Sequence, residues 1–171
     1  MPIKRGWEGR FFEDFEVGDV YRSRLGRTIS EADNTWFTLL TNNTNQLHFN
    51  AEYGKATDFG ERLVNSALTL AIVTGLAVTD VSENGFALGW DQIDLPNPVF
   101  AGDTLYAESL VLKKRESNSR PHAGIVKIKT RGLNQHGDDI VTWERTFFVY
   151  KRGAEAAASP FPEAKSLFEA D

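Results

Sequence analysis

The chain has 171 residues, of which 41% are hydrophobic and 25% are charged. This length corresponds to about one domain, and so much apolar material supports a folded core and excludes a disordered chain. Nineteen basic and twenty-four acidic side chains give a formal net charge of −5, which counts against a general nucleic-acid binder. The absence of cysteine excludes a disulfide scaffold, thiolate metal sites and a cysteine nucleophile.

Neither a membrane span nor a metal site is expected. The longest apolar stretch, residues 63–78, is interrupted by polar residues and is shorter than the ~20 residues that cross a bilayer. The first ten residues, MPIKRGWEGR, lack the apolar core of a secretion signal, so we expect a cytoplasmic protein without a membrane partner. The three histidines, His48, His122 and His136, have no recognisable ligand spacing, so we expect no bound metal.

The first half of the chain is predicted to be helical after an opening strand. Strand-like residues cover 19–25, behind a Gly-Asp turn. Ser30 is a typical N-cap, and Asp33, three residues later, completes a capping box. The segment 36–40 (WFTLL) predicts the apolar face of a helix, which ends in the Asn-rich loop 41–50.

A second helix and four strands are predicted after this loop. Residues 63–78 (LVNSALTLAIVTGLAV) are apolar nearly all round and rich in small residues, which predicts a helix buried on most of its faces. Val126 and Ile128 alternate with charged residues, so the sheet is expected to have one dry and one wet face. The strands, separated by Pro, Gly and Asn, are expected over residues 87–95, 104–114, 124–133 and 140–151.

Helices followed by consecutive strands indicate an α+β domain with an antiparallel sheet. The simplest arrangement wraps this sheet around the central helix 63–78, within a single domain of residues 1–152. Residues 153–171 are small, polar and twice interrupted by proline, which predicts a surface tail. Because a sheet of this kind exposes strand edges, we expect a second copy to cover them in a homodimer or higher homo-oligomer.

Polar residues gather immediately before the predicted buried helix, in 43–48 (NTNQLH) and at Asn65 and Ser66. The first N–H groups of a helix are unpaired and carry the positive end of its dipole, so they can polarise a carbonyl oxygen. His48 can exchange a proton near neutral pH. Taken alone, the pattern also fits a solvated histidine in a loop of turn-forming asparagines, with Asn65 and Ser66 capping the helix.

At these residues the chain resembles the MaoC-like hydratases, also called R-specific or type-2 enoyl-CoA hydratases. Their motif runs Ser-Gly-Asp-x-Asn-Pro-Leu-His, then Ala-Thr-x-Phe-Gly, then His-Gly at the start of the central helix. Here the three stretches are residues 41–48 (TNNTNQLH), 56–60 (ATDFG) and 65–66 (NS). The resemblance covers about residues 11–150. It implies a single hot-dog domain, with five to six antiparallel strands around helix 63–78.

The departures from the motif fall on residues that would perform the chemistry. The catalytic Asp of the family falls on Asn43, which cannot act as a base, and the His-Gly pair falls on residues 65–66. The stretches 88–94 (LGWDQID) and 115–135 are similar to one branch of the family, the mesaconyl-CoA and itaconyl-CoA hydratases. Those enzymes act on branched C5 dicarboxylic acyl-CoA thioesters.

The resemblance implies a lyase that reversibly hydrates an α,β-unsaturated acyl-CoA, with CoA as part of the substrate and no separate cofactor. Asn65 and Ser66 would bind the substrate, with the N–H groups there holding the thioester oxygen. His48 would shuttle the proton, and Asn43 would orient the water by hydrogen bonds. Asn45 is placed with the substrate-binding residues and is expected to fix the loop and not to perform chemistry.

Basic residues are candidates for binding the anionic groups of such a substrate. A free carboxylate favours arginine because of its planar fork, and Arg62 lies beside the site in the sequence, although a solvated surface arginine would look the same. The CoA phosphates need cations at the mouth of the site. The densest positive run of the chain contains Lys113, Lys114, Arg115 and Arg120, a pattern that solvated strand ends also show.

Two other functions stay open on the sequence alone, since fold does not decide function. A hot-dog thioesterase would hydrolyse the thioester and normally needs an acidic residue in the central helix, which residues 63–78 lack. A non-catalytic acyl-CoA-binding protein would explain Asn43 as the mark of a lost base. Loss of the enoyl group without release of thiol would indicate a hydratase, and release of thiol would indicate a thioesterase. Binding of the acyl-CoA without either change would indicate a non-catalytic protein.

Overall fold

The computed structural model describes residues 4, 6–154, 162 and 164–166. Two 3-10 helices occur there, η1 (Phe12–Asp14) and η2 (Gln46–His48). The α-helices are α1 (Glu31–Leu40), α2 (Ala51–Lys55) and α3 (Ser66–Val81). The strands are β1 (Val20–Arg22), β2 (Arg27–Thr28), β3 (Gly85–Asp94), β4 (Thr104–Glu116), β5 (Ala123–Leu133) and β6 (Asp139–Tyr150).

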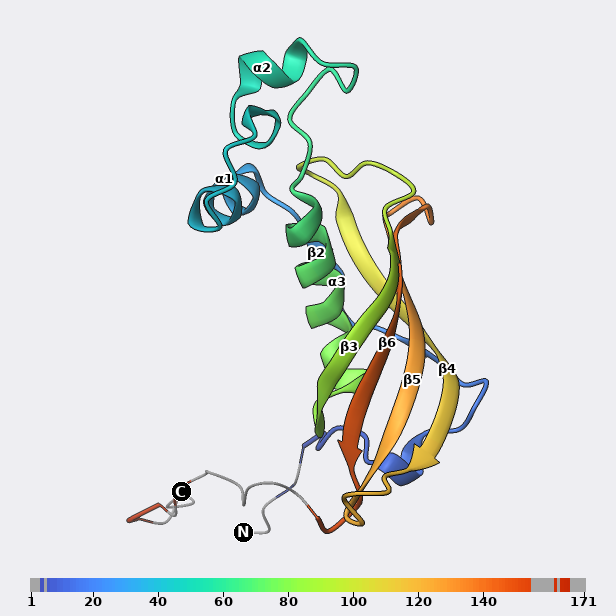
Figure 1. The fold of residues 1–171 in the computed structure, drawn as a ribbon. Helices are drawn as coiled ribbons and strands as arrows, with labels where there is room; N and C mark the ends of the chain where they lie inside the picture. Colours follow the sequence, from blue (N-terminus) through green and yellow to red (C-terminus); the bar gives the residue numbers. More distant parts are fainter. Residues whose placement is uncertain (1–3, 5, 155–161, 163, 167–171) are drawn as a thin grey trace.

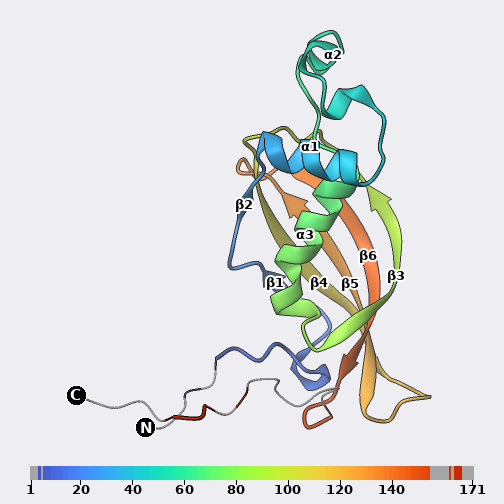
Figure 2. The ribbon, with the colours of Figure 1, turned by 90° about the vertical axis from the view of Figure 1, so that its left-hand side faces the viewer.

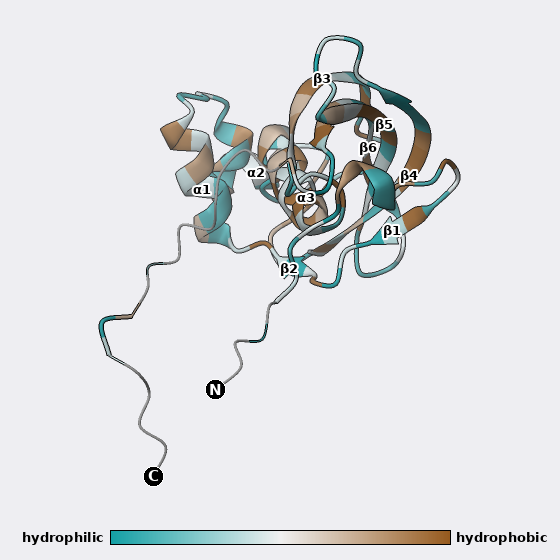
Figure 3. Ribbon diagram, turned by 90° about the horizontal axis from the view of Figure 1, so that it is seen from below, coloured by the Kyte–Doolittle hydropathy of each residue, from teal (hydrophilic) through white to brown (hydrophobic). Residues whose placement is uncertain are grey.

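The strands form one antiparallel sheet in the order β1-β4-β5-β6-β3, with β2 paired to β4 beside this path. The long strands curve around α3, which lies in the hollow of the sheet (Figures 1 and 3). The helices α1 and α2 lie beyond the N-terminal end of α3 (Figure 2). The predicted α+β architecture, an antiparallel sheet wrapped around a central helix, is therefore confirmed.

The central helix begins later and ends later than residues 63–78. It starts at Ser66 because Asn65 has extended backbone angles and caps the helix with its side chain. Leu63 instead forms an isolated β-bridge with Phe100. The helix continues to Val81, which is buried against the sheet together with Val73. Burial of each such side chain contributes roughly 1.5–3 kcal/mol to folding.

The four long strands lie within two residues of their predicted bounds. In β5, Val126 and Ile128 are fully buried, whereas Lys129 is exposed, so the expected dry and wet faces are confirmed. The dry face of β6 carries Trp143, which is almost completely buried. It also carries Arg145, two residues further along, which hydrophobic patterning does not explain.

Arg145 is only 3% exposed, and no carboxylate pairs with it in the part of the chain that the structure describes. Its Nη2 donates to Ser82 Oγ at 3.2 Å, and its guanidinium lies 5.3 Å from the centre of the Phe147 ring. Burial lowers the pKa of Arg145 to about 10, so it is charged at neutral pH. Ser82 follows the last residue of α3, whose C-terminal dipole end favours a cation.

The helix α1 has the predicted capping box, but its apolar face lies on the outer side. The Asp33 N–H donates to Ser30 Oγ at 3.1 Å, and the Ser30 N–H donates to Asp33 Oδ2 at 2.8 Å. Trp36 is 69% exposed and Leu40 is 75% exposed, and only Phe37 of this apolar segment packs against the core. The inner side of the helix also carries the buried polar residues Asn34 and Thr38. The inner side meets backbone groups at the start of α3, which need hydrogen bonds more than apolar contacts.

The strand predicted over residues 19–25 is shorter in the structure, and a second short strand follows it. Both β1 and β2 pair with β4, and the segment between them passes Tyr106 at Gly26. A Cβ at Gly26 would lie 2.3 Å from the Tyr106 ring, so this crossing requires glycine or a shift of the ring.

The predicted tail, residues 153–171, lies mostly outside the described residues. The division into a domain of 1–152 and a tail therefore stays a prediction. No helix in the described ranges has both the length and the apolar character needed to cross a membrane.

Candidate active site at the start of α3

His48 ends the 3-10 helix η2 and is 8% exposed. Its Nδ1 lies 2.9 Å from the carbonyl oxygen of Leu63, in the segment that leads into α3. Because a carbonyl oxygen only accepts, this contact places the ring proton on Nδ1 and the lone pair on Nε2. Nε2 has no hydrogen-bonding partner among the described residues and is not fully buried. His48 is therefore prepared to accept a proton through Nε2.

Two residues that the sequence analysis missed, Asn34 and Thr38, connect α1 to this histidine and to α3. Asn34 Nδ2 donates to the carbonyl oxygens of His48 and Leu63, at 2.9 and 3.1 Å. Asn34 Oδ1 accepts from the Asn65 N–H at 2.9 Å, and Thr38 Oγ1 accepts from Asn65 Nδ2 at 3.2 Å. Both residues are buried on one side of α1. Their spacing of four residues, opposite the apolar side chains, is the signal that could have found them.

Asn65 and Ser66 share the N-terminus of α3, but they differ in what they offer a ligand. Asn65 Oδ1 accepts from the Ala67 N–H at 3.0 Å, and Asn65 Nδ2 donates to Thr38 Oγ1. Both polar groups of this side chain are therefore used within the protein. Ser66 is exposed, and its N–H has no acceptor among the described residues. Ser66 is therefore better placed than Asn65 to bind an oxygen of a ligand.

The Asn-rich loop consists of two successive side-chain turns. Asn43 Oδ1 accepts from the Asn45 N–H at 3.0 Å, and Asn45 Oδ1 accepts from the Leu47 N–H at 3.1 Å. Asn45 thus stabilises the loop directly before His48. Asn43 forms no hydrogen bond with His48, and within the described ranges its Nδ2 has no partner. Asn43 therefore offers a free donor and no base.

Arg62 lies at the edge of the site, where it forms an ion pair with Glu31 of α1. Its side chain is 23% exposed, so it is partly shielded from solvent, and its role as a carboxylate-binding residue stays a prediction. The basic run that contains Lys114 lies at the opposite end of the sheet from α1 and α2 (Figure 1). There Lys114 Nζ donates to the carbonyl oxygen of Phe15 at 2.7 Å. This run is therefore not at the mouth of the site within one chain.

A cleft of about 290 Å³ opens beside the N-terminal end of α3. One wall comes from Leu63, Ser66 and Thr69, and the other from residues 95–99, between β3 and β4. Leu63 is the residue whose carbonyl holds His48, and Ser66 carries the unpaired N–H. The cleft is mostly apolar, with few polar groups, which is typical of a small-molecule site.

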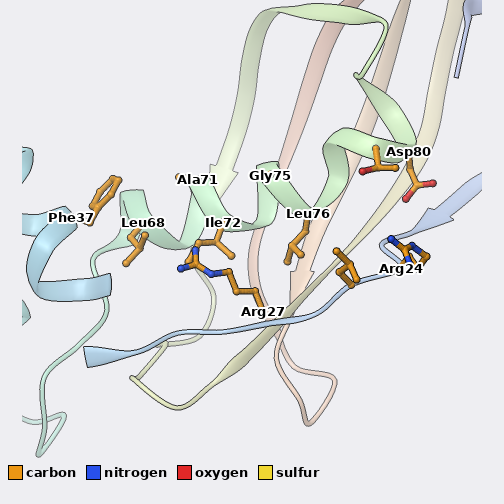
Figure 4. A pocket seen from close by; sticks show the side chains of 11 residues that line it. Arg24, Arg27, Phe37, Leu68, Ala71, Ile72, Gly75, Leu76 and Asp80 are labelled. Atoms are coloured by element: carbon orange, nitrogen blue, oxygen red, sulfur yellow. The ribbon is translucent and has the colours of Figure 1, made fainter. Parts of the chain in front are cut away.

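A larger groove of about 380 Å³ runs along the outer side of α3 (Figure 4). Its floor is apolar, and Arg24 and Arg27 line it from the segment that includes β2 (Figure 4). Arg27 is already paired with Asp33 at 2.6 Å. None of the site residues named above lines this groove, whereas Ser66 lines the smaller cleft. His48 and Asn43 line neither, and His48 is connected to the smaller cleft through the Leu63 carbonyl oxygen.

His48 carries no carboxylate partner in the part of the chain that the structure describes. Asp58 and Glu61, which are near in the sequence, are both exposed. No group of three or more metal-binding side chains occurs in the described ranges either. Among the described residues, His48 is therefore the titratable side chain that the hydrogen bonds place at the start of α3.

Comparison with known proteins gives consistent matches over the helices and strands described above. A family model described as mesaconyl-CoA hydratase matches residues 4–164. The mesaconyl-CoA hydratase of Cereibacter sphaeroides is 35% identical over 160 residues, which are 93% of this chain and 46% of that protein. The (R)-specific enoyl-CoA hydratase of Rhodospirillum rubrum is 30% identical over 143 residues, which are 84% of this chain and 94% of that protein.

A solved structure supports the same relationship. The crystal structure of a MaoC domain dehydratase from Chloroflexus aurantiacus has a TM-score of 0.83 and 28% identity, and the match covers 95% of this chain and 46% of that one. The chain thus spans about half the length of the curated mesaconyl-CoA hydratase that it matches. The shorter enoyl-CoA hydratase corresponds to it over nearly its whole length.

Proposed function

Because the chain belongs to the mesaconyl-CoA hydratase family, within the MaoC-like hot-dog hydratases, we propose that it is a hydro-lyase for an α,β-unsaturated acyl-CoA. The observation that carries the proposal is the 2.9 Å contact between His48 Nδ1 and the Leu63 carbonyl oxygen. It leaves Nε2 as a proton acceptor, on a ring that is held by Leu63, three residues before the unpaired Ser66 N–H. Hydration of a conjugated thioester needs both functions, a base for the water and a donor for the thioester oxygen.

In the proposed hydration, His48 Nε2 and the Ser66 N–H act on the water and on the thioester. His48 Nε2 takes a proton from water while the water oxygen bonds to the β-carbon of the substrate. The electron pair of the C=C bond moves toward the thioester oxygen, where the Ser66 N–H stabilises the developing negative charge. The proton then passes from His48 to the α-carbon, which restores the neutral imidazole. Dehydration follows the same steps in reverse.

In this proposal Asn43 orients the water and does not deprotonate it. Its Nδ2 is free to donate to the water oxygen, while its Oδ1 is used by the Asn45 N–H. A positioned acid–base group contributes about 10²–10⁴-fold to the rate. A chain with Asn43 instead of Asp therefore depends on His48 for this contribution.

We propose that the substrate is a branched C5 dicarboxylic acyl-CoA, such as mesaconyl-CoA or itaconyl-CoA. A protein named for mesaconyl-CoA hydration is 35% identical to the chain. Arg62 is the guanidinium proposed to receive the free carboxylate, which requires that carboxylate to replace Glu31. CoA is part of the substrate, and the reaction needs no separate cofactor. A cytoplasmic location is part of the same proposal.

A second hot-dog unit is the partner that the open edge of the sheet requires. Strand β3 lies at the edge and pairs only with β6 among the described strands. Phe86, Leu88 and Trp90 of this strand are exposed. An exposed apolar edge is a surface that pairs with another strand. We propose a homodimer in which β3 of each copy lies at the interface.

The activity is tested with crotonyl-CoA, mesaconyl-CoA and itaconyl-CoA, by following enoyl absorbance and free thiol separately. We expect loss of enoyl absorbance without thiol release, fastest with the dicarboxylic thioesters. The absence of turnover with all three substrates would contradict the proposal, and thiol release would identify a thioesterase. Saturable binding without either signal would identify a non-catalytic binding protein.

The non-catalytic alternative is favoured by one specific observation, the amide at position 43. The thioesterase alternative has less support, although α3 does contain an acidic residue. Asp80 lies in the last turn of α3, at the end opposite His48, and is paired with Arg10 at 3.5 Å. It is therefore not available to act on a thioester at the start of the helix.

A further inference from the structure

The Leu63 carbonyl oxygen is a shared acceptor for α1 and for the loop that carries His48. It lies 2.9 Å from His48 Nδ1 and 3.1 Å from Asn34 Nδ2. A carbonyl oxygen has two lone pairs, so both donors can bond to it at the same time. Asn34 Nδ2 also donates to the backbone carbonyl of His48 at 2.9 Å. One carboxamide therefore holds both chain segments that orient the imidazole.

Asn34 is suited to this task because its polar groups are used and it is shielded from water. Its side chain is 1% exposed, and its Oδ1 accepts from the Asn65 N–H at 2.9 Å. A fully satisfied buried polar group holds its neighbours in a defined geometry. The three bonds join α1, the His48 loop and the start of α3.

We propose that Asn34 is a positioning residue that holds the His48 imidazole with its proton on Nδ1 and its lone pair on Nε2. It acts through the Leu63 carbonyl oxygen and the His48 backbone, without touching the substrate. The hydrogen bond at one ring nitrogen sets the state of the other, which is the general way in which a histidine is oriented. The consequence for turnover rests on the proposed function, whereas the consequence for the tautomer does not.

The orientation of the His48 ring can be tested in the wild-type protein by measurements that need no enzymatic activity. In spectra of protein labelled with ¹⁵N at the histidine rings, we expect neutral His48 to show the Nδ1–H tautomer, with assignment by comparison with His48→Gln. We also expect the Asn34 side-chain amide protons to exchange slowly, unlike those of Asn43, whose Nδ2 has no described partner. An Nε2–H tautomer, or Asn34 protons that exchange as fast as those of Asn43, would overturn the proposal.

Two substitutions separate positioning from simple packing. Asn34→Leu keeps the approximate volume, and Asn34→Asp keeps an acceptor for the Asn65 N–H, but ionised Asp donates neither bond to the two carbonyls. We expect both variants to lose the uniform Nδ1–H signal and to lower kcat by about 10–100-fold, with KM changed less than about threefold. The matched control is Asn50→Asp, which makes the same chemical change at the N-cap of α2, where Asp is also a good cap.

The outcomes distinguish this proposal from the proposed function. If the wild-type protein shows the Nδ1–H tautomer but hydrates none of the three thioesters, the function is wrong and the positioning by Asn34 stands. If Asn34→Leu is folded, as judged by circular dichroism, and retains both the tautomer and kcat, Asn34 is only a packing residue. A variant that fails to fold leaves the decision to the two wild-type measurements.

Discussion

At His48, the groups that orient the ring are backbone carbonyls and a buried amide, not a carboxylate. Nδ1 is bonded to Leu63, and Asn34 holds the same carbonyl from α1. A neutral partner does not add the Coulombic stabilisation that a carboxylate gives to a charged imidazole. This arrangement fits a histidine that must release its proton again within one turnover.

Replacement of His48 by Ala should lower kcat for hydration by about 10² or more, because no other described titratable group is bonded within the site. Initial rates with mesaconyl-CoA measure the effect. His122→Ala is the control, since His122 is exposed and stacks on Tyr150 at the other end of the sheet. Near-normal turnover of His48→Ala would remove His48 from the mechanism.

Asn43→Asp should raise the hydration rate of a simple enoyl-CoA. The carboxylate can still accept the Asn45 N–H and adds a base at the position where the family motif has one. We expect a gain of about tenfold or more in kcat/KM for crotonyl-CoA, measured beside mesaconyl-CoA. An equal loss with both substrates would show that the amide is required for reasons other than substrate choice.

The sequence pointed to the chemically distinctive residues of the candidate site but not to how they are held. His48 and Ser66 could be found because an imidazole and a helix start have recognisable local patterns. Asn34 was missed because its partners are backbone carbonyls of residues far away in the chain. Such partners have no side-chain signature. The ion pair of Arg62 with Glu31 could not be predicted for a different reason, because the two charged side chains lie far apart in the chain.

At the scale of elements, α1 shows what binary patterning can and cannot determine. The capping box and the spacing of residues 36–40 predicted a helix correctly. They did not predict that the apolar side chains would lie on the outer surface. Patterning assigns the buried side by hydrophobicity, but α1 also faces backbone groups that need hydrogen bonds, so polar side chains are buried there beside Phe37.

Ser30→Ala should destabilise the protein by about 1 kcal/mol, because it removes the side-chain acceptor of the α1 capping box. For a domain of this size that corresponds to a fall in Tm of roughly 2–4 °C. Thermal unfolding by circular dichroism measures it. Ser119→Ala, in the exposed β4–β5 turn, is the control and should leave Tm unchanged. Equal Tm values for Ser30→Ala and wild type would show that the cap contributes nothing.

Glu108 lies on β4, on the outer face of the sheet, and makes the folding stability of the protein depend on pH. Its carboxylate accepts from Arg22 Nε and Arg131 Nε, each at 2.7 Å, and these hydrogen bonds lower its pKa. A carboxyl group with a lowered pKa stabilises the fold above its unfolded pKa, and this stabilisation is lost as the pH falls through the folded pKa.

Glu108→Gln should therefore have a lower Tm than the wild-type protein at pH 7, by a few degrees. The difference should narrow as the pH falls through the lowered folded pKa of Glu108, because the carboxylate is then protonated in the folded protein too. Thermal unfolding between pH 3 and 7 measures both effects, with Glu52→Gln on the exposed side of α2 as control. A Tm difference that is constant over this range would contradict a role for the charge.

At the scale of the whole molecule, the strand order leaves β3 at an open edge of the sheet. This position is set by the chain connections between the strands and not by the amino-acid composition of β3. The sequence predicted each long strand through its alternation. It did not predict which strand lies at the edge, because the helix α3 and the β3–β4 connection decide that. Nor did alternation predict Arg145 on the dry face, which is stabilised by Ser82 and the end of α3.

The proposed dimer predicts a molecular mass near twice the 19.1 kDa of one chain in light scattering at micromolar concentration. Leu88→Lys places a charge on the exposed edge strand and should shift the mass toward that of one chain. Val17→Lys, an equally apolar but unrelated exposed position, is the control. A wild-type protein that stays monomeric would contradict the dimer.

The attachment of α1 through Asn34 and Thr38 has a consequence for how the family can diversify. The segment that carries His48 is joined to α1 and α3 by directional polar bonds, so its solvent-facing positions contribute little to the hydrophobic core. Mutations there can exchange one acid–base group for another at small cost in folding free energy. A chimera that takes residues 31–62 from an enoyl-CoA hydratase should fold on this sheet and acquire the donor's substrate preference.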